Sequence, residues 1–213
     1  MKKIAVLVSG GGTNLQALID AQHRGEILGG EIVNGEIMAV IASKPGVFAL
    51  ERAAKANIPG YVVCRKEYDS NRAMTVALVE KLKELNIDLV VLAGFMIILT
   101  EEMVQAYPNA IINVHPALIP SFCGEGYYGL HVHEKALEYG VKLSGATVHF
   151  VSEECDGGPI ILQKSVAVEE GDTPETLQRR IMEQAEWKIL PEAVSLFCQD
   201  RLHVEGRIVK ITE

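Results

Sequence analysis

The sequence has 213 residues, of which 48% are hydrophobic, 23% charged and 6% aromatic. This length and composition suit a globular protein with a buried core and exclude disordered and fibrous classes. The 20 basic and 28 acidic residues give a net charge of −8, which opposes long-range attraction to a nucleic-acid backbone. We therefore expect no nucleic-acid partner, whereas anionic small molecules remain possible ligands.

The lengths of the apolar stretches and the spacing of the cysteines disfavour a membrane span and a zinc site. The longest apolar stretch covers residues 89–99 and is broken by Gly94, which is about half of the ~20 residues that a membrane span needs. The four cysteines are widely spaced and form no CxxC pair. We therefore expect reduced thiols in a cytoplasmic protein, with no zinc site and no disulfide framework.

Apolar runs rich in β-branched residues alternate with helical patterns through the first half of the chain. These runs predict buried strands, and the patterns between them predict helices. Strands are expected over residues 4–8, 36–43, 60–64, 89–93 and 111–114, and helices over residues 15–24, 47–56 and 70–85. Such alternation implies right-handed crossovers. The predicted fold class is α/β, with a doubly wound, mostly parallel central sheet and helices on both faces.

The pattern changes after His115. We expect a long loop over residues 116–129, a helix over 131–139, strands over 144–151 and 159–168, and a hairpin over 202–211. A long helix capped by Thr173 should bury one stripe of apolar residues, and Pro191 should kink it. That stripe consists of Leu177, Ile181, Ala185 and Ile189. We predict a single domain over residues 1–213, with halves of about 1–115 and 116–213.

A glycine turn, Gly10-Gly11-Gly12, follows the first strand and precedes Thr13 and Asn14. Amides of such a turn at a helix N-terminus favour a phosphate. The spacing matches neither the dinucleotide-binding nor the Walker motif, which disfavours NAD and ATP and favours a smaller phosphate ester. The alternative is a tight turn that serves packing only.

Asn113 and His115 stand two residues apart at the end of the fifth predicted strand, so their side chains share one face of it. An amide and an imidazolium there form a credible pair for stabilising an oxyanion, although a buried structural histidine is the alternative. Asp156 stands beside two glycines and could form a turn or orient a histidine. The residues alone favour the turn.

Three other histidines are candidate metal ligands or pocket residues. His131 and His133 would resemble a two-ligand metal motif only on a strand. We expect a helix to begin there, so that the two rings diverge and no metal binds. His149 could belong to the core or line a pocket.

Four segments occur in this order: SGGGTNLQ (9–16), AGFM (93–96), NVHPALIP (113–120) and DGGPII (156–161). Together they resemble the phosphoribosylglycinamide formyltransferase family, the folate-dependent transformylases of purine synthesis. The resemblance extends from Ile4 to the long C-terminal helix. It implies the formyltransferase fold and formyl transfer from 10-formyltetrahydrofolate, as co-substrate, to the amine of glycinamide ribonucleotide on the route to IMP. The transfer would be direct and would pass through a tetrahedral intermediate.

The resemblance also implies roles for individual residues. Asn113 would contact the formyl group, His115 would be the catalytic acid, and Asp156 would pair with His115, raise its pKa and keep it cationic. The ribonucleotide would be bound by Gly12, Thr13, Asn14 and Glu186. The C-terminal half would contain the folate site, whose residues would be Met96, Ile97, Ile98, Leu99, Asn113, Glu153, Glu154, Cys155 and Asp156.

The sequence departs from the family pattern in two places. Relatives often carry an arginine where Asn71 stands, to meet the anionic tail of folate, and the adjacent Arg72 is a candidate replacement. The segment from Phe122 to Tyr128 is unusual, with a cysteine and two adjacent tyrosines.

The runner-up function is formyltetrahydrofolate hydrolase, which would use the same asparagine, histidine and aspartate with water as acceptor. A rival of another class is a noncatalytic module that binds a phosphate ester. It would explain the glycine turn but not the convergence of Asn113, His115 and Asp156. We expect a monomer or a weak homodimer and no membrane partner.

Overall fold

The computed structural model describes residues 1–24 and 31–212 of the chain. The strands are β1 (Lys2–Val8), β2 (Gly35–Ala42), β3 (Gly60–Val62), β4 (Leu89–Leu92), β5 (Ile111–His115), β6 (Leu143–Phe150), β7 (Ile160–Ala167), β8 (Leu202–Glu205) and β9 (Ile208–Ile211). The helices are α1 (Thr13–Arg24), α2 (Phe48–Lys55), α3 (Asn71–Glu84), α4 (Glu101–Ala106), α5 (Leu130–Tyr139), α6 (Pro174–Ile181) and α7 (Trp187–Cys198).

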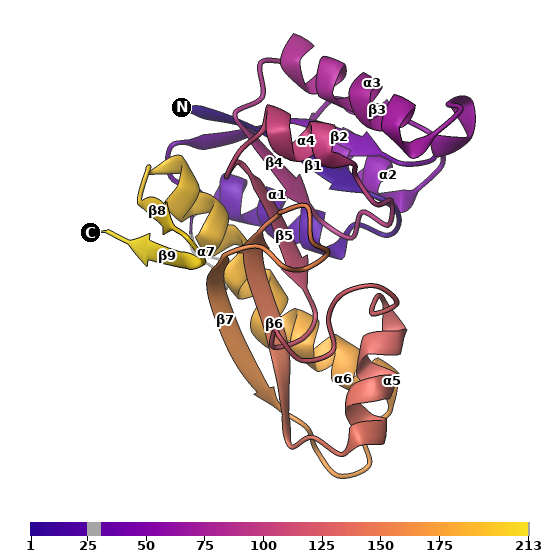
Figure 1. Ribbon diagram of the computed structural model, residues 1–213, viewed down its shortest axis with the longest axis vertical. Helices are drawn as coiled ribbons and strands as arrows, with labels where there is room; N and C mark the ends of the chain where they lie inside the picture. The colour runs from indigo at the N-terminus through magenta and orange to yellow at the C-terminus, as the bar shows by residue number, and fades with distance from the viewer. Residues whose placement is uncertain (25–30, 213) are drawn as a thin grey trace.

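One 9-stranded sheet runs through the molecule in the order β3-β2-β1-β4-β5-β6-β7-β9-β8 (Figure 1). The strands from β3 to β5 are parallel, and β6 and β7 continue the sheet antiparallel. The prediction of a doubly wound, mostly parallel α/β sheet is confirmed.

Both faces of the parallel strands are buried. In β1, Ile4, Val6 and Val8 contribute to one apolar cluster, and Ala5 and Leu7 contribute to the other. Helices α1, α2 and α7 cover the first face, and α3 and α4 cover the second. Burial on both faces is the reason that β1 reads as a continuous apolar run.

Two regions differ from the expected elements. The short helix α4 is not among the predicted elements. Met103 is its only buried residue, and a single buried position cannot produce the apolar periodicity that indicates a helix. After α6 the chain passes through a π-helical segment, Met182–Glu186, and α7 then continues through Pro191. The irregularity expected at Pro191 therefore lies before it. The predicted stripe is confirmed, since all four of its residues are buried.

The predicted long loop over residues 116–129 is anchored near its start and at its middle. Near its start, the Thr147 hydroxyl of β6 donates to the Ala117 carbonyl (2.7 Å) and accepts from the Ile119 amide (3.1 Å). Further on, the Phe122 ring lies 5.9 Å from that of Tyr139 in α5. These contacts bring Phe122 over the carboxyl end of β5.

Candidate active site

Asn113, His115 and Asp156 meet at the carboxyl end of β5. The first two lie on β5, and Asp156 comes from the loop between β6 and β7. The His115 Nδ1 atom lies 3.4 Å from the Asp156 Oδ2 atom, and the Asn113 Nδ2 atom lies 3.5 Å from Oδ1. The expected convergence of the three side chains is therefore observed.

His149 belongs to the same cluster. It stands opposite Asn113 in the β5–β6 pairing, and its Nδ1 atom lies 2.8 Å from the carbonyl of Phe150, to which it donates. Its Nε2 atom lies 3.1 Å from the Asn113 Nδ2 atom and 3.6 Å from the Asp156 Oδ1 atom. The ring, which is 2% exposed, lines the site rather than the apolar core.

Asp156 both forms a turn and acts as a side-chain partner. Its φ is +53°, a left-handed conformation that aspartate tolerates. Its carboxylate also accepts from the amide of Gly124, at 2.9 Å. Burial raises the pKa of this carboxyl, but hydrogen bonding by His149, the charge of His115 and the Gly124 amide outweigh it, so the net pKa is lowered. Asp156 is therefore ionised at neutral pH.

The net pKa of His115 is lowered rather than raised, although Asp156 acts in the expected direction. Burial lowers its pKa, and the opposing effects of Asp156 and of the Phe122 carbonyl do not compensate for it. The ring is 4% exposed, and its Nε2 atom donates to the Phe122 carbonyl at 2.8 Å. The pKa of the ring is thus below that of an ordinary histidine, and its outer N–H is donated to the loop.

A second polar group joins the start of α1 to the π-helical segment. The Asn14 Nδ2 atom donates to the Glu186 Oε2 atom at 2.6 Å, although the two residues are 172 positions apart. Burial raises the pKa of Glu186 to about 7, against the effect of the Asn14 hydrogen bond. The Asn14 Oδ1 and Trp187 Nε1 atoms are buried without a partner in the described part of the chain.

The glycine turn combines packing with an open surface. Gly12 has φ +73°, and a Cβ there would lie 2.7 Å from the Ala49 Cβ atom, so packing alone demands glycine. At Gly10 and Gly11 a Cβ would meet nothing within 4 Å. Those two glycines leave open the surface where an anion would approach the backbone.

The segment Met96, Ile97, Ile98 and Leu99 lies after β4. The Met96 amide donates to the Ser9 hydroxyl at 2.9 Å, at the edge of the glycine turn. Met96 and Ile98 are 55% and 65% exposed, whereas Ile97 and Leu99 pack against the core. The segment therefore offers an apolar surface beside the turn.

The other residues expected at the folate site precede Asp156. Glu153, Glu154 and Cys155 are exposed, and the Glu154 carbonyl accepts from the Gly157 amide at 3.0 Å. A Cβ at Gly158 would lie 1.7 Å from the Phe150 carbonyl oxygen. Only glycine fits there, and this close approach helps to position Asp156.

The candidate replacement for an arginine at position 71 is Arg72, whose side chain is largely exposed. Its guanidinium pairs with Glu102. The cation against Asn71 is instead Arg65, whose Nε atom donates to the Asn71 Oδ1 atom and whose Nη1 atom donates to the Tyr68 carbonyl at 2.6 Å.

The histidine pair 131 and 133 diverges as expected. His131 lies 3.1 Å from Glu134 on the exposed side of α5, whereas His133 is fully buried. Within residues 1–24 and 31–212, no group of three or more histidine, cysteine or acidic side chains could bind a metal ion. Over the same described range, no helix is long and apolar enough to cross a bilayer.

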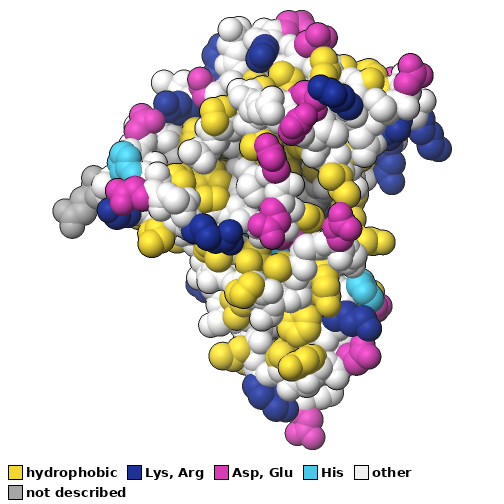
Figure 2. Space-filling view, viewed as in Figure 1, with side chains coloured by type: hydrophobic (Ala, Val, Ile, Leu, Met, Phe, Trp, Pro, Cys, Tyr) yellow, Lys and Arg dark blue, Asp and Glu magenta, His cyan; other side chains and the backbone are white. Residues whose placement is uncertain are grey.

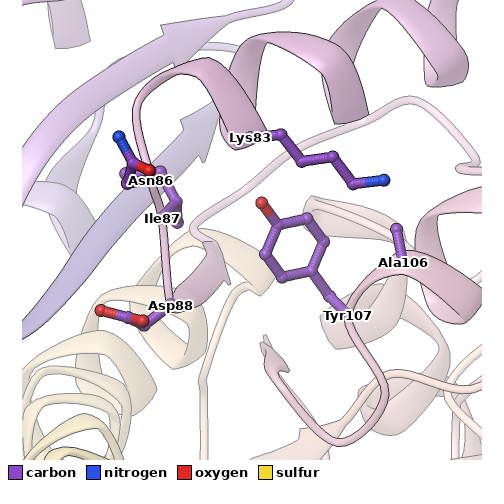
Figure 3. Close-up of a pocket in the computed structure, with 6 residues that line it drawn as sticks. All are labelled: Lys83, Asn86, Ile87, Asp88, Ala106 and Tyr107. Atoms are coloured by element: carbon purple, nitrogen blue, oxygen red, sulfur yellow. The ribbon is translucent and has the colours of Figure 1, made fainter.

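A hollow lies elsewhere on the molecule, between the end of α3 and the end of α4 (Figure 3). It is lined by Lys83, Asn86, Ile87, Asp88, Ala106 and Tyr107. It opens at the amino end of β4, whereas ligands of parallel α/β sheets bind at the carboxyl ends of strands. We therefore assign it no role in the chemistry.

Comparison with known proteins identifies relatives of the whole chain. A family model described as formyl transferase matches residues 2–194. A Haemophilus influenzae phosphoribosylglycinamide formyltransferase is 42% identical over 208 residues, which cover 98% of this chain and 92% of that protein. The solved structure of glycinamide ribonucleotide transformylase 1 from Symbiobacterium toebii matches with a TM-score of 0.91 and 44% identity, covering 100% of this chain and 95% of that one.

A longer relative shares the same region. The Bos taurus trifunctional purine biosynthetic protein adenosine-3 is 43% identical over 213 residues, or 99% of this chain. This chain spans 20% of the bovine protein. The similarity therefore concerns one part of that protein.

Proposed function

The chain belongs to the formyl transferase family, and we propose that its site transfers a formyl group from 10-formyltetrahydrofolate to the amine of glycinamide ribonucleotide. It is a one-carbon group transferase of purine biosynthesis that acts on small molecules. The convergence of Asn113, His115 and Asp156 at the carboxyl end of β5 is the observation that carries the assignment of roles.

The acceptor binds between the glycine turn and the π-helical segment. Amides around Gly12, with the side chains of Thr13 and Asn14, hold the phosphate at the start of α1, where the helix dipole favours negative charge. Glu186 meets the glycinamide end. The direct contact between Asn14 and Glu186 supports one continuous acceptor site.

The folate binds on the other side of Asn113. The exposed Met96 and Ile98, with Ile97 and Leu99, supply apolar surface for it. The loop of Glu153, Glu154, Cys155 and Asp156 borders its ring system. No metal ion takes part.

Transfer begins when the neutral amine attacks the formyl carbon, and the carbonyl oxygen becomes an oxyanion. Asn113 Nδ2 donates to this oxygen; its contact with Asp156 is long, at 3.5 Å, and can be exchanged. His115 Nε2–H is the second donor. Donors aimed at charge that develops in the transition state accelerate the reaction more than they tighten substrate binding.

The loop must release His115 before this can happen. The Nε2–H is donated to the Phe122 carbonyl, so the formyl oxygen has to replace that carbonyl as acceptor. Asp156 faces the other ring nitrogen, Nδ1. A proton arriving at Nδ1 is therefore stabilised by the carboxylate.

Proton movement closes the reaction. The attacking amine loses one proton, and the departing folate nitrogen gains one, so no proton is consumed overall. An imidazole whose pKa is lowered by burial and raised in part by a neighbouring carboxylate suits this exchange. Transfer is direct, because both substrates meet at the same cluster and no covalent nucleophile is needed.

We place the enzyme in the cytoplasm as a monomer or weak homodimer, with one domain whose first half binds the nucleotide and whose second half borders the folate. The net charge of −8 and the interspersed acidic and basic side chains on the face drawn in Figure 2 support the absence of nucleic-acid and membrane partners.

The deciding experiment follows deformylation of 10-formyltetrahydrofolate with and without glycinamide ribonucleotide. We expect turnover that requires the ribonucleotide, and a loss of about 10²–10³-fold in turnover for His115→Ala. Turnover that ignores the ribonucleotide would instead identify a hydrolase. Binding of the ribonucleotide without any turnover would identify a noncatalytic module.

A further inference from the structure

Helix α2 holds the glycine turn through two hydrogen bonds. The Ala49 amide donates to the Gly10 carbonyl at 3.2 Å, and the Arg52 Nε atom donates to the Gly11 carbonyl at 2.9 Å. In a trans peptide the carbonyl and the following N–H point in opposite directions. The amides of Gly11 and Gly12 are therefore turned away from α2.

The Arg52 guanidinium is itself fixed from two further sides. Its Nη1 atom donates to the Gln16 Oε1 atom at 2.9 Å, and it lies 4.9 Å from the centre of the Phe48 ring. The planar guanidinium group of arginine presents its N–H donors as a rigid fork, so little side-chain entropy is lost for each hydrogen bond that it forms. Arg52 thus ties the turn both to α2 and to the first turns of α1.

Among residues 1–24 and 31–212, no carboxylate pairs directly with Arg52. The one carboxylate in its network, Asp20, is reached only through the Gln16 amide. A positive charge therefore remains behind a turn whose amides face outward.

We propose that Arg52 is a positioning residue for the acceptor phosphate: its fork orients the amides of the glycine turn, and its charge strengthens their attraction for the dianion. The inference rests on the proposed function, because it needs the phosphate to bind at this turn. Arg52 acts through the backbone of Gly11 and Gly12 and takes no part in formyl transfer.

The test compares Arg52→Gln with Arg52→Lys and with a matched control, Lys55→Gln. Lys55 lies on the same helix and also approaches the Phe48 ring, at 5.6 Å, so the control removes the same charge nearby. Each variant is assayed with glycinamide ribonucleotide and with its dephosphorylated riboside. Inorganic phosphate is added as a competing probe.

For Arg52→Gln we expect KM for the ribonucleotide and the inhibition constant of phosphate to rise about 10-fold or more. The kcat value and the reaction of the riboside should stay within about 2-fold, because neither involves the phosphate. Arg52→Lys should recover part of the loss, because it restores the charge without the fork. Lys55→Gln should behave like the parent enzyme.

An equal loss with both acceptors would mean that Arg52 only supports the fold, and the inference would fail. It would also fail if Lys55→Gln matched Arg52→Gln, since general charge would then explain the effect. A parent enzyme with equal kcat/KM for both acceptors would refute the phosphate site itself, and Arg52 with it. If Arg52→Gln does not fold, the same comparison of acceptors is made with Arg52→Lys.

Discussion

At the scale of single residues, His115 is balanced between two opposing influences. Burial favours the neutral ring, and the ionised Asp156 favours the charged one. Replacing the carboxylate by an amide of the same shape removes the larger of the two effects that raise this pKa. We therefore predict that Asp156→Asn lowers the pKa of His115 further below its ordinary value.

The measurement is an NMR titration of the histidine rings in the ligand-free protein. His115→Gln identifies which resonance belongs to this ring. A pKa that rises in Asp156→Asn, or one that lies above the ordinary value in the parent protein, would contradict the electrostatic argument. The variant should also lose activity, because the proton at Nδ1 no longer meets a carboxylate.

Glu186 supports a second prediction at this scale. Its carboxyl has a pKa of about 7 in the folded protein, against about 4.3 for an unfolded chain. The folded state therefore keeps its proton over a range where the unfolded state has lost it. This contribution to stability is greatest below about pH 4.3 and declines as pH rises towards 7, where the buried carboxylate becomes charged.

Glu186→Gln should remove that decline. At pH 5 the variant and the parent should be similar in stability, because a glutamine resembles the protonated acid and can still accept from Asn14. At pH 8 the variant should be more stable by about 1–3 kcal/mol, while KM for glycinamide ribonucleotide rises. Denaturant unfolding at both pH values measures the difference, and a stability gap that does not change with pH would disprove it.

The sequence predicts some of these residues and not others, for physical reasons. Asn113 and His115 are predictable because a two-residue spacing at a strand end places both side chains on one face. The pairing of Asp156 with a histidine is less predictable. A simple turn already accounts for an aspartate beside two glycines, so the sequence gives no sign of a side-chain partner. His149 requires the register that places it opposite Asn113, which no local pattern contains. The contact between the Phe122 carbonyl and His115 depends on the path of the whole loop, which the local sequence does not reveal.

At the scale of elements, the start of α6 depends on one buried carboxylate. Asp172 accepts from Arg180 at 2.6 and 2.7 Å, from the Glu169 amide at 2.8 Å and from the Thr176 hydroxyl at 2.9 Å. Hydrogen bonds from Arg180 hold the pKa of Asp172 well below its usual range, against the effect of burial. Its stabilising contribution is therefore complete above about pH 4 and is lost as pH falls further.

Asp172→Asn should destabilise the protein by about 1–3 kcal/mol at pH 7, and the deficit should shrink below about pH 4. Glu169→Gln is the matched control, since Glu169 also pairs with Arg180, at 3.1 Å, but is 66% exposed. Its effect should stay below about 1 kcal/mol. Thermal unfolding between pH 3 and 7 measures both variants. An equal loss of stability in the two variants would show that the buried pair of Asp172 with Arg180 contributes no more than the exposed pair of Glu169 with Arg180.

Local sequence patterns predict the start of α6 but not the π-helical segment that follows it. The α6 cap was predictable, since Thr173 and Pro174 are a favoured start, and the observed capping box agrees. The π-helical segment before Pro191 was not, because the proline marks an irregularity without fixing on which turn it falls. The resulting placement of Glu186 near Asn14 depends on the packing of α1 against α7.

At the scale of the whole molecule, the acceptor site joins the two ends of the chain. One sheet continues through both halves, and the contact of Asn14 with Glu186 links α1 to the π-helical segment. A ligand held by both should stabilise all of these elements together. The single tryptophan, Trp187, follows Glu186 directly, so its fluorescence reports on this junction.

We therefore predict one thermal transition, with coincident curves from Trp187 fluorescence and far-ultraviolet circular dichroism. Glycinamide ribonucleotide at 100 times its Kd should raise Tm by about 5–10 °C in both signals. In Asn14→Ala the same concentration should shift Tm much less, because the phosphate contact and the link to Glu186 are lost together. Two separate transitions, or a ligand shift confined to the fluorescence signal, would mean that the halves unfold independently and that the site does not join them.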